Sequence, residues 1–303
     1  MQGNEEKKHN IRGHKILLAS VLCLFGFCLL AQKPVQNKQS RPQQEAKAQA
    51  PKKQQAKSKV YLIHSDMLRK DSRHPDAQVV TGNVVFRHDS VYMYCDSAYY
   101  YDKLGSFEAF SNVKMNQGDT LFLYGDRLYY DGNTQIAEVR NNVRMENRNT
   151  TLLTDSLNYD RLYNLGYFFD GGTLMDEQNV LTSEWGEYNP STKQSVFNYN
   201  VKLVNPQFTL TSDTLEYNTQ SKVAEIVGPS DILSDNNHIY SEQGTYNTAT
   251  GKAALYQRSI ITNDAKQLTG DTLFYDRNTG VGEAFSHMEM RDTINKNMMT
   301  GEY

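Results

Sequence analysis

The sequence predicts an all-β repeat protein, and three features support this fold class. The chain of 303 residues holds 20 Tyr and 12 Phe but one Trp and seven Pro, and aromatic residues favour strands. Asn, Asp and Gly punctuate short alternating apolar segments, as they do at turns between strands. The strongest feature is an internal repeat of 29 to 31 residues, which is the signature of a repeat architecture.

Acidic residues mark the repeat. An acid preceded by a small residue or Cys recurs at Asp66, Asp96, Asp126, Asp155, Glu184, Asp213, Glu242, Asp271 and Glu302. A tyrosine stands four residues after the acid in seven consecutive units, and the first unit has Lys70 there instead. This regularity predicts an elongated domain of about eight units over residues 60–303, with equivalent residues stacked in columns.

Within a unit the pattern alternates with a period of two. In "DTLFYD", Leu273 and Tyr275 face one side of the predicted strand, and the residues between them face the other. A polar turn leads to a second piece such as "EAFSNVKMN", and a third piece such as "DTLFLYG" leads into the next acid. We expect two to three short strands per unit and about twenty in all. Two architectures fit this pattern: an antiparallel jelly roll or folded-over sheet, and a right-handed parallel β-helix.

The N-terminal 59 residues differ from the repeats. Basic residues precede the apolar run Ile16 to Ala31, which has the length of a signal-peptide core and is short for a bilayer-spanning helix. Residues 1–31 are predicted to be a cleaved signal peptide, with a retained inner-membrane anchor as the alternative. A lipoprotein is disfavoured because a bulky residue precedes each cysteine of the run. Residues 32–59, rich in Gln, Lys, Ala and Pro, are predicted to be a disordered basic linker, and the rest of the chain is predicted to be exported.

Charge separates the linker from the repeats. Residues 1–31 carry +2 and residues 32–59 carry +7, so residues 60–303 carry −12, because the whole chain carries −3. An acidic domain disfavours nucleic acid as a partner, since binding nucleic acid needs a basic face. The linker is interpreted as a solvated tether, with contact to an anionic membrane surface as the alternative. Cys95 is the one cysteine outside the apolar run, so no disulfide is predicted in the mature chain.

The segment Ser111 to Met145, "SNVKMNQGDTLFLYGDRLYYDGNTQIAEVRNNVRM", resembles the OstA-like domain of LptA-type lipopolysaccharide-transport proteins. It shares an "NV" strand start, an acid after Gly, an apolar-x-Tyr strand, a short turn and a strand ending near Ala. The resemblance runs from about residue 61 to 303, and the 29-residue repeat is similar to that of OstA-like proteins of the Bacteroides type. It implies a periplasmic, V-shaped antiparallel jelly roll whose inner face holds the acyl chains of lipopolysaccharide. It also implies head-to-tail edge-strand pairing with other Lpt-type β-jelly-roll proteins.

The repeated acid has a catalytic and a structural interpretation. Glycoside hydrolases use paired carboxylates, but a catalytic acid is singular, and this acid recurs in every unit. We therefore interpret it as a structural corner that accepts hydrogen bonds. The seven histidines lack the spacing of metal ligands, and the sequence predicts no catalytic residue, no metal site and no cofactor. A carbohydrate-active β-helix enzyme and a structural or adhesive repeat protein are the alternative functions.

The tyrosine column either packs in a solid core or lines a groove, and the sequence leaves this choice open. In the second interpretation an apolar β-trough binds lipopolysaccharide or a similar amphiphile and passes it toward the outer membrane. Methionine offers adaptable surface for such a ligand. The candidate trough-lining residues are Tyr100, Leu128, Tyr130, Leu157, Tyr159, Tyr188, Leu215, Tyr217, Tyr246, Leu273, Tyr275, Val113, Met115, Val143 and Met145.

Overall fold

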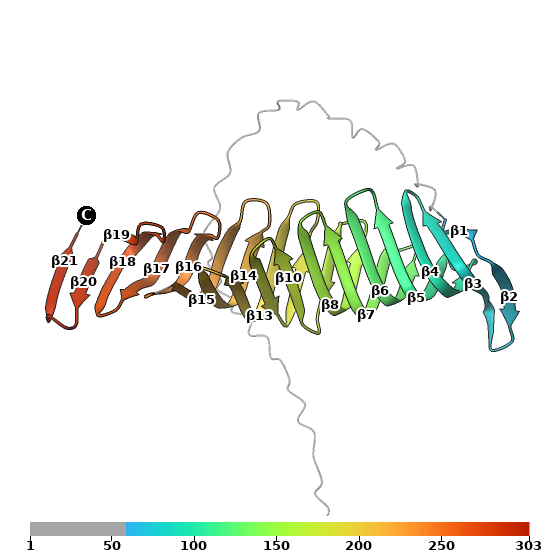
Figure 1. Cartoon of the computed structure of the whole chain (residues 1–303), viewed down its shortest axis with the longest axis horizontal. Helices are drawn as coiled ribbons and strands as arrows, with labels where there is room; N and C mark the ends of the chain where they lie inside the picture. The colour runs from blue at the N-terminus through green and yellow to red at the C-terminus, as the bar shows by residue number, and fades with distance from the viewer. Residues whose placement is uncertain (1–58, 235, 303) are drawn as a thin grey trace, which may run out of the picture. The chain divides into compact units, whose positions relative to one another are not determined.

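The computed structural model describes residues 59–234 and 236–302, and the regular structure of these residues is entirely β-strand (Figure 1). Residues 1–58, which hold the predicted signal peptide or anchor and nearly all of the predicted linker, lie outside the described residues. Within the described ranges, no helix has the length and apolar character needed to cross a membrane.

The described residues form one sheet of 21 strands, and every pair of neighbouring strands is antiparallel. The strands are β1 (Tyr61–His64), β2 (Met67–Asp71), β3 (His74–His88), β4 (Val91–Tyr101), β5 (Ser106–Gln117), β6 (Leu121–Asp131), β7 (Ile136–Asn147), β8 (Thr150–Asp160), β9 (Leu165–Phe168), β10 (Gly172–Asp176), β11 (Asn179–Ser183), β12 (Trp185–Tyr188), β13 (Gln194–Asn205), β14 (Phe208–Asn218), β15 (Val223–Ser234), β16 (Asn237–Asn247), β17 (Lys252–Asn263), β18 (Lys266–Asp276), β19 (Val281–Phe285), β20 (Met288–Asp292) and β21 (Asn297–Gly301). The prediction of an antiparallel all-β repeat is confirmed, and the parallel β-helix is excluded by the pairing.

Each unit contributes two long strands, most of 11 or 12 residues. Two strands per unit and 21 strands in the described residues agree with the expected two to three per unit and about twenty in all. The expectation that the strands are short is wrong, because the piece before the acid and the piece after it form one strand, as "LFLYGDRLYYD" does in β6. Successive long strands pair side by side, and Figure 1 shows them following one another from β3, in blue-green, to β18, in orange.

Every long strand bends at its middle, where the pairing shifts register, as it does between Phe110 and Val113. Two successive residues in this bend have positive φ, 62° at Ser111 and 50° at Asn112. Asn enters this left-handed region more readily than most residues. The bend divides each strand between two facing layers. Layer A contains residues such as 106–110 and 127–131, and layer B contains residues such as 113–117 and 121–125.

The middle of the repeat departs from this plan. The strand that would follow β8 is split into β9 and β10, and the next is split into β11 and β12 at Glu184. The Phe168 ring fills the space beside the split. A Cβ atom on Gly172 or Gly186 would lie 2.6 Å from this ring, so both glycines are needed for its packing.

The core lies between the two layers as one cluster of buried residues that runs from Val60 to Tyr275. The inner column of layer B consists of Phe86, Met93, Met115, Leu123, Met145, Leu152, Leu174, Leu181, Leu203, Leu210, Ile232, Ile239 and Ile261. Burial of such side chains drives folding, at about 1.5–3 kcal/mol for each. Because side chains alternate along a strand, the residues between these inward-facing ones face outward.

Candidate functional site

All seven tyrosines of the predicted column lie in layer A, directly before the turn that ends each strand, and none exposes more than 5% of its surface. Small residues separate most of them. Tyr130 pairs with Ala137, which pairs with Tyr159, and Gly166 stands between Tyr159 and Tyr188. The column therefore alternates a large ring with a small side chain along the interior.

The remaining candidate residues also face this interior. Leu128, Leu157, Leu215 and Leu273 form a second column of layer A, while Val113, Met115, Val143 and Met145 belong to layer B, and all eight are buried. The structure thus brings every sequence-predicted site residue into one continuous apolar interior. That this interior serves as a trough for a ligand stays a prediction.

The hydroxyls of Tyr130, Tyr188 and Tyr217 reach across the interior to layer B. The Tyr130 hydroxyl lies 2.6 Å from His88 Nδ1, and the Tyr217 hydroxyl donates to Asp176 Oδ2 at 2.8 Å. Each partner is the last residue of its layer B strand. These tyrosines therefore connect the two layers along one side of the molecule. On this side lie the turns that join successive strands of layer A and those that join successive strands of layer B. We call this side the mouth; it lies opposite the bends.

Basic side chains complete these contacts at the mouth. Lys222 Nζ lies 2.8 Å from both carboxylate oxygens of Asp176, and Arg277 Nη1 donates to the Tyr246 hydroxyl at 2.8 Å. Arg161 Nη1 donates to the Tyr130 hydroxyl. Burial nevertheless raises the pKa of Tyr130 to about 12, although the neighbouring Arg161 charge opposes this shift. Burial also raises the pKa of Tyr217, and the Asp176 carboxylate adds to this effect.

Sequence reasoning missed this polar row, although a signal for it exists. The last residue of successive layer B strands is polar in every unit. These residues are His88, Gln117, Asn147, Asp176, Asn205, Ser234, Asn263 and Asp292. A second column with the period of the tyrosines indicates polar partners for the hydroxyls, because buried hydroxyl groups need hydrogen bonds.

The repeated acids stand at the bends, on the outer side. Asn142 Nδ2 donates to Asp126 at 2.6 Å, and Asn112 Nδ2 donates to Asp96 at 2.7 Å. The acids stand at the bends, as structural corners would. They were expected where a strand begins, but they lie in the middle of a strand, as Asp126 does in β6. Side-chain amides donate to four of the acids, which are Asp66, Asp96, Asp126 and Glu184. Asp155 accepts a hydrogen bond from the backbone N–H of Asn142, and Asp271 pairs with the His287 ring. In the part of the chain that the structure describes, no three His, Cys, Asp or Glu side chains come together as metal ligands would.

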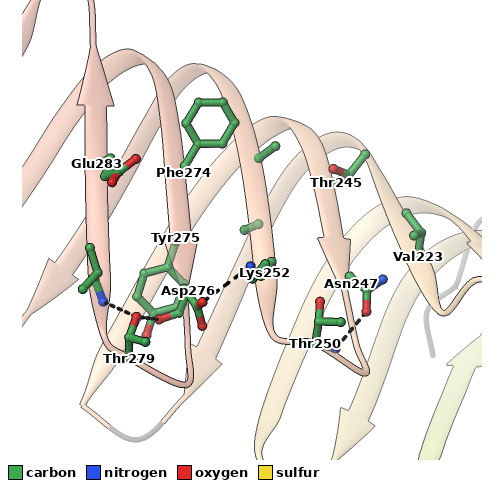
Figure 2. A pocket seen from close by; sticks show the side chains of 13 residues that line it. Val223, Thr245, Asn247, Thr250, Lys252, Phe274, Tyr275, Asp276, Thr279 and Glu283 are labelled. Atoms are coloured by element: carbon green, nitrogen blue, oxygen red, sulfur yellow. Dashed lines mark hydrogen bonds and ion pairs between the residues drawn. The ribbon is translucent and has the colours of Figure 1, made fainter.

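The interior opens toward β19–β21. Along the inner column of layer B the exposed fraction rises from 7% at Ile261 to 37% at Met290 and 62% at Met299. Nearby, a hollow of about 640 Å³ is lined by residues that include Phe274 and Tyr275. Figure 2 shows these two side chains on opposite faces of β18.

A folded-over antiparallel repeat with an apolar interior and a polar mouth defines the class of this protein. The family model described as OstA-like protein matches residues 57–213 and 209–271, and the chain belongs to this family. The resemblance seen in the sequence is therefore confirmed.

Among solved structures, the chain is similar to the crystal structure of LptH, the LptA-homologous periplasmic component of the lipopolysaccharide transport device from Pseudomonas aeruginosa. The two are 13% identical, the match covers 42% of this chain and 97% of that chain, and the TM-score is 0.34. A comparison with the curated proteins found no match.

Proposed function

We propose that this protein binds lipopolysaccharide or a similar amphiphile in the periplasm, holds its acyl chains between the two layers and passes it toward the outer membrane. It catalyses no reaction in this role. The observation that carries the proposal is the continuous apolar interior of a chain that belongs to the OstA-like family. The description of LptH as part of a lipopolysaccharide transport device supports the same role.

The interior has the chemistry that acyl chains need. Its columns consist of Leu, Ile, Val and Met, and burying each CH₂ of an acyl chain contributes about 0.8 kcal/mol. The interior is filled by the protein's own side chains, so a bound chain has to displace some of them. The tyrosine rings are suited to move, because a small residue such as Ala137 or Gly166 stands beside them in the column.

Entry of an acyl chain through the mouth requires that tyrosine contacts between the layers open. These contacts are hydrogen bonds, each of which contributes only about 0.5–1.5 kcal/mol net, or about 1.5–3 kcal/mol when a charged group takes part. Several CH₂ groups buried in the interior offset the loss of one such bond. The edge of β21 is suited to pair with another β-jelly-roll protein.

Site-specific photocrosslinking tests this proposal. Tyr130 and Tyr129 are neighbours in β6, but Tyr130 is fully buried in the interior and Tyr129 is 42% exposed on the outer face. We expect p-benzoylphenylalanine at position 130 to crosslink an acyl-bearing lipid in cells, and the same group at position 129 to yield none. A melting measurement on both variants controls for misfolding. Equal yields, or no acyl-bearing product at either position, would contradict the proposal.

The filled interior also favours a second function, that of a structural spacer. A spacer requires a packed core and no ligand, and the buried columns of both layers meet the first requirement. Lipid extraction followed by mass spectrometry separates the two functions. Acyl-bearing molecules that copurify with the protein support transport, and their absence together with failed crosslinking at position 130 supports the spacer.

A further inference from the structure

The outer face of layer B carries a cluster of aromatic and basic side chains over β1 and β3–β7. We call this cluster the outer platform. It consists of Tyr61, Arg87, Tyr92, Tyr94, Lys114, Phe122, Tyr124 and Arg144. The cluster forms two cross-strand rows, one of which runs Tyr94, Lys114, Tyr124, Arg144 along successive pairs of strands.

Cations and rings contact one another within the platform. The Arg144 guanidinium lies 4.3 Å from the centre of the Tyr124 ring, and Lys114 Nζ lies 5.5 Å from the Phe122 ring and 5.8 Å from that of Tyr124. Such cation–π contacts hold the charged groups in place above the sheet. Tyr94 remains 36% exposed. The platform therefore presents exposed rings and ordered positive charges together.

The later repeats show that the fold does not require this cluster. The row that holds Lys114 and Tyr124 continues through Lys202, Thr211 and Asp231 in β13–β15, where the backbone pairing is the same. The platform residues include three basic side chains and no acid, and of these three Arg144 forms an ion pair with Glu146 beside the platform, whereas residues 60–303 together carry −12. The platform is thus a local reversal of the charge of the domain.

Two carboxylates at the border of the outer platform are placed to accept hydrogen bonds from a ligand. Asp96 and Asp126 are the next outward-facing residues after Tyr94 and Tyr124 along their strands, and both are exposed. A hollow of about 350 Å³ beside Tyr94 and Asp96 adjoins the platform. A carboxylate has about four acceptor sites, and each of these two acids uses one of them for an Asn side-chain amide. Both acids are therefore able to accept further hydrogen bonds from hydroxyl groups.

We propose that the outer platform binds an anionic saccharide. The C–H faces of sugar rings pack on the tyrosine rings, phosphate or carboxylate substituents pair with Lys114, Arg144 and Arg87, and hydroxyl groups donate to the corner acids. The glycan part of a lipopolysaccharide is one source of such a ligand, and to that extent the proposal rests on the proposed function. It concerns a different face of the molecule from the acyl-binding interior.

Calorimetric titration of the full chain with a short oligogalacturonate tests the charge and the sugar faces together. The fully methyl-esterified oligomer has the same rings without the carboxylates. We expect the acidic oligomer to bind, the ester to bind at least about tenfold more weakly, and the affinity for the acidic oligomer to fall as salt is added. Polyglutamate, which has carboxylates but no sugar rings, should bind at least about tenfold more weakly than the acidic oligomer.

The repeat offers matched control variants. Lys114→Ser removes a platform cation, whereas Lys202→Ser removes a cation from the same row outside the platform. Tyr94→Ala has Tyr240→Ala as its control, since Tyr240 continues the same row in β16. We expect each platform variant to weaken binding about tenfold and each control to leave it unchanged, with thermal midpoints measured for all four.

Several results would overturn the proposal. These are no binding of the acidic oligomer at millimolar concentration, equal binding of the ester or of polyglutamate, and equal effects of Lys114→Ser and Lys202→Ser. Titration with deacylated lipopolysaccharide then distinguishes the source of the saccharide, because it contains no acyl chain. Crosslinking of lipid at position 130 without saccharide binding overturns this inference alone, and the reverse result overturns the acyl-binding interior alone.

Discussion

The tyrosines of the column combine two roles in one side chain. Each ring packs in the apolar interior, and the hydroxyls of Tyr130, Tyr188 and Tyr217 reach a polar residue at the end of a layer B strand. Among these contacts, that of Tyr217 differs because its partner, Asp176, is a buried carboxylate that also pairs with Lys222. The partner of Tyr188 is instead the neutral Asn147, at 3.3 Å.

This difference predicts unequal effects of removing the hydroxyl. Tyr217→Phe should lower the free energy of unfolding by about 1.5–3 kcal/mol, since a hydrogen bond to a charged group is lost. Tyr188→Phe, two strands away in the same column, should cost only about 0.5–1.5 kcal/mol. Urea denaturation of both variants measures this, and an equal or reversed order would contradict the assigned partners.

The buried tyrosines also predict a loss of stability in alkali. Burial raises the pKa of Tyr130 to about 12 in the folded protein, whereas an unfolded tyrosine has a pKa of about 10. The folded state therefore holds its proton longer, and its stability is fully present below about pH 10 and falls as the pH rises toward 12. Absorbance of tyrosinate, followed with circular dichroism, should show exposed tyrosines ionising first and the column ionising together with unfolding. Ionisation of all tyrosines in one step before unfolding would rule this out.

At the scale of the strand, the bend is the defining element. A pair of residues with positive φ, such as Asn141 and Asn142, turns the strand from one layer to the other, and the corner acid binds the second of the two. The bend allows one strand to serve both layers without ending its hydrogen-bonded ladder.

Substitutions of Asn142 separate the two contributions to the bend. Asn142→Ala loses the bond to Asp126 and places a Cβ-bearing residue of poor left-handed propensity at φ 51°, so it should cost about 1–2 kcal/mol. Asn142→Gly loses the same bond but tolerates the backbone angle, and it should cost less. Thermal and urea unfolding measure both, and a glycine variant less stable than the alanine variant would show that backbone angle is not the main term.

The sequence predicted which residues of a strand face inward better than it predicted where each strand begins and ends. The alternation of Leu273 and Tyr275 correctly placed inner and outer faces. The same alternation could not show that strands continue through the acid, because a corner and a strand end carry the same polar residues, as Asp126 and Asp131 do in β6. The polar column that contains His88 and Asp176 is visible in the sequence, but which tyrosine hydroxyl meets which of its members depends on how the two layers fold together.

At the scale of the molecule, each unit contacts mainly the units on either side of it. The stability of such a repeat is the sum of unit and neighbour terms, and units with fewer buried residues open more often. β20 and β21 contain no buried residue, whereas inner positions of β7 and β14 are fully buried.

Hydrogen exchange should therefore follow a gradient along the chain. We expect backbone amides of β20–β21 and of β1–β2 to exchange at least about tenfold sooner than those of β6–β16. Mass spectrometry of peptic fragments measures this in the full chain. Uniform protection from β3 to β21 would show instead that the repeat unfolds as a single unit.

The two-strand unit also acts as a ruler. Strands in a sheet lie about 4.7–4.9 Å apart, so each additional unit extends the domain by about 9–10 Å while its cross-section stays the same. Adding or removing a whole unit keeps every inner residue inside, whereas a change of one residue within a strand would turn half of that strand inside out. The distance that a protein of this design spans is therefore adjustable in fixed steps, independently of what its interior is built to hold.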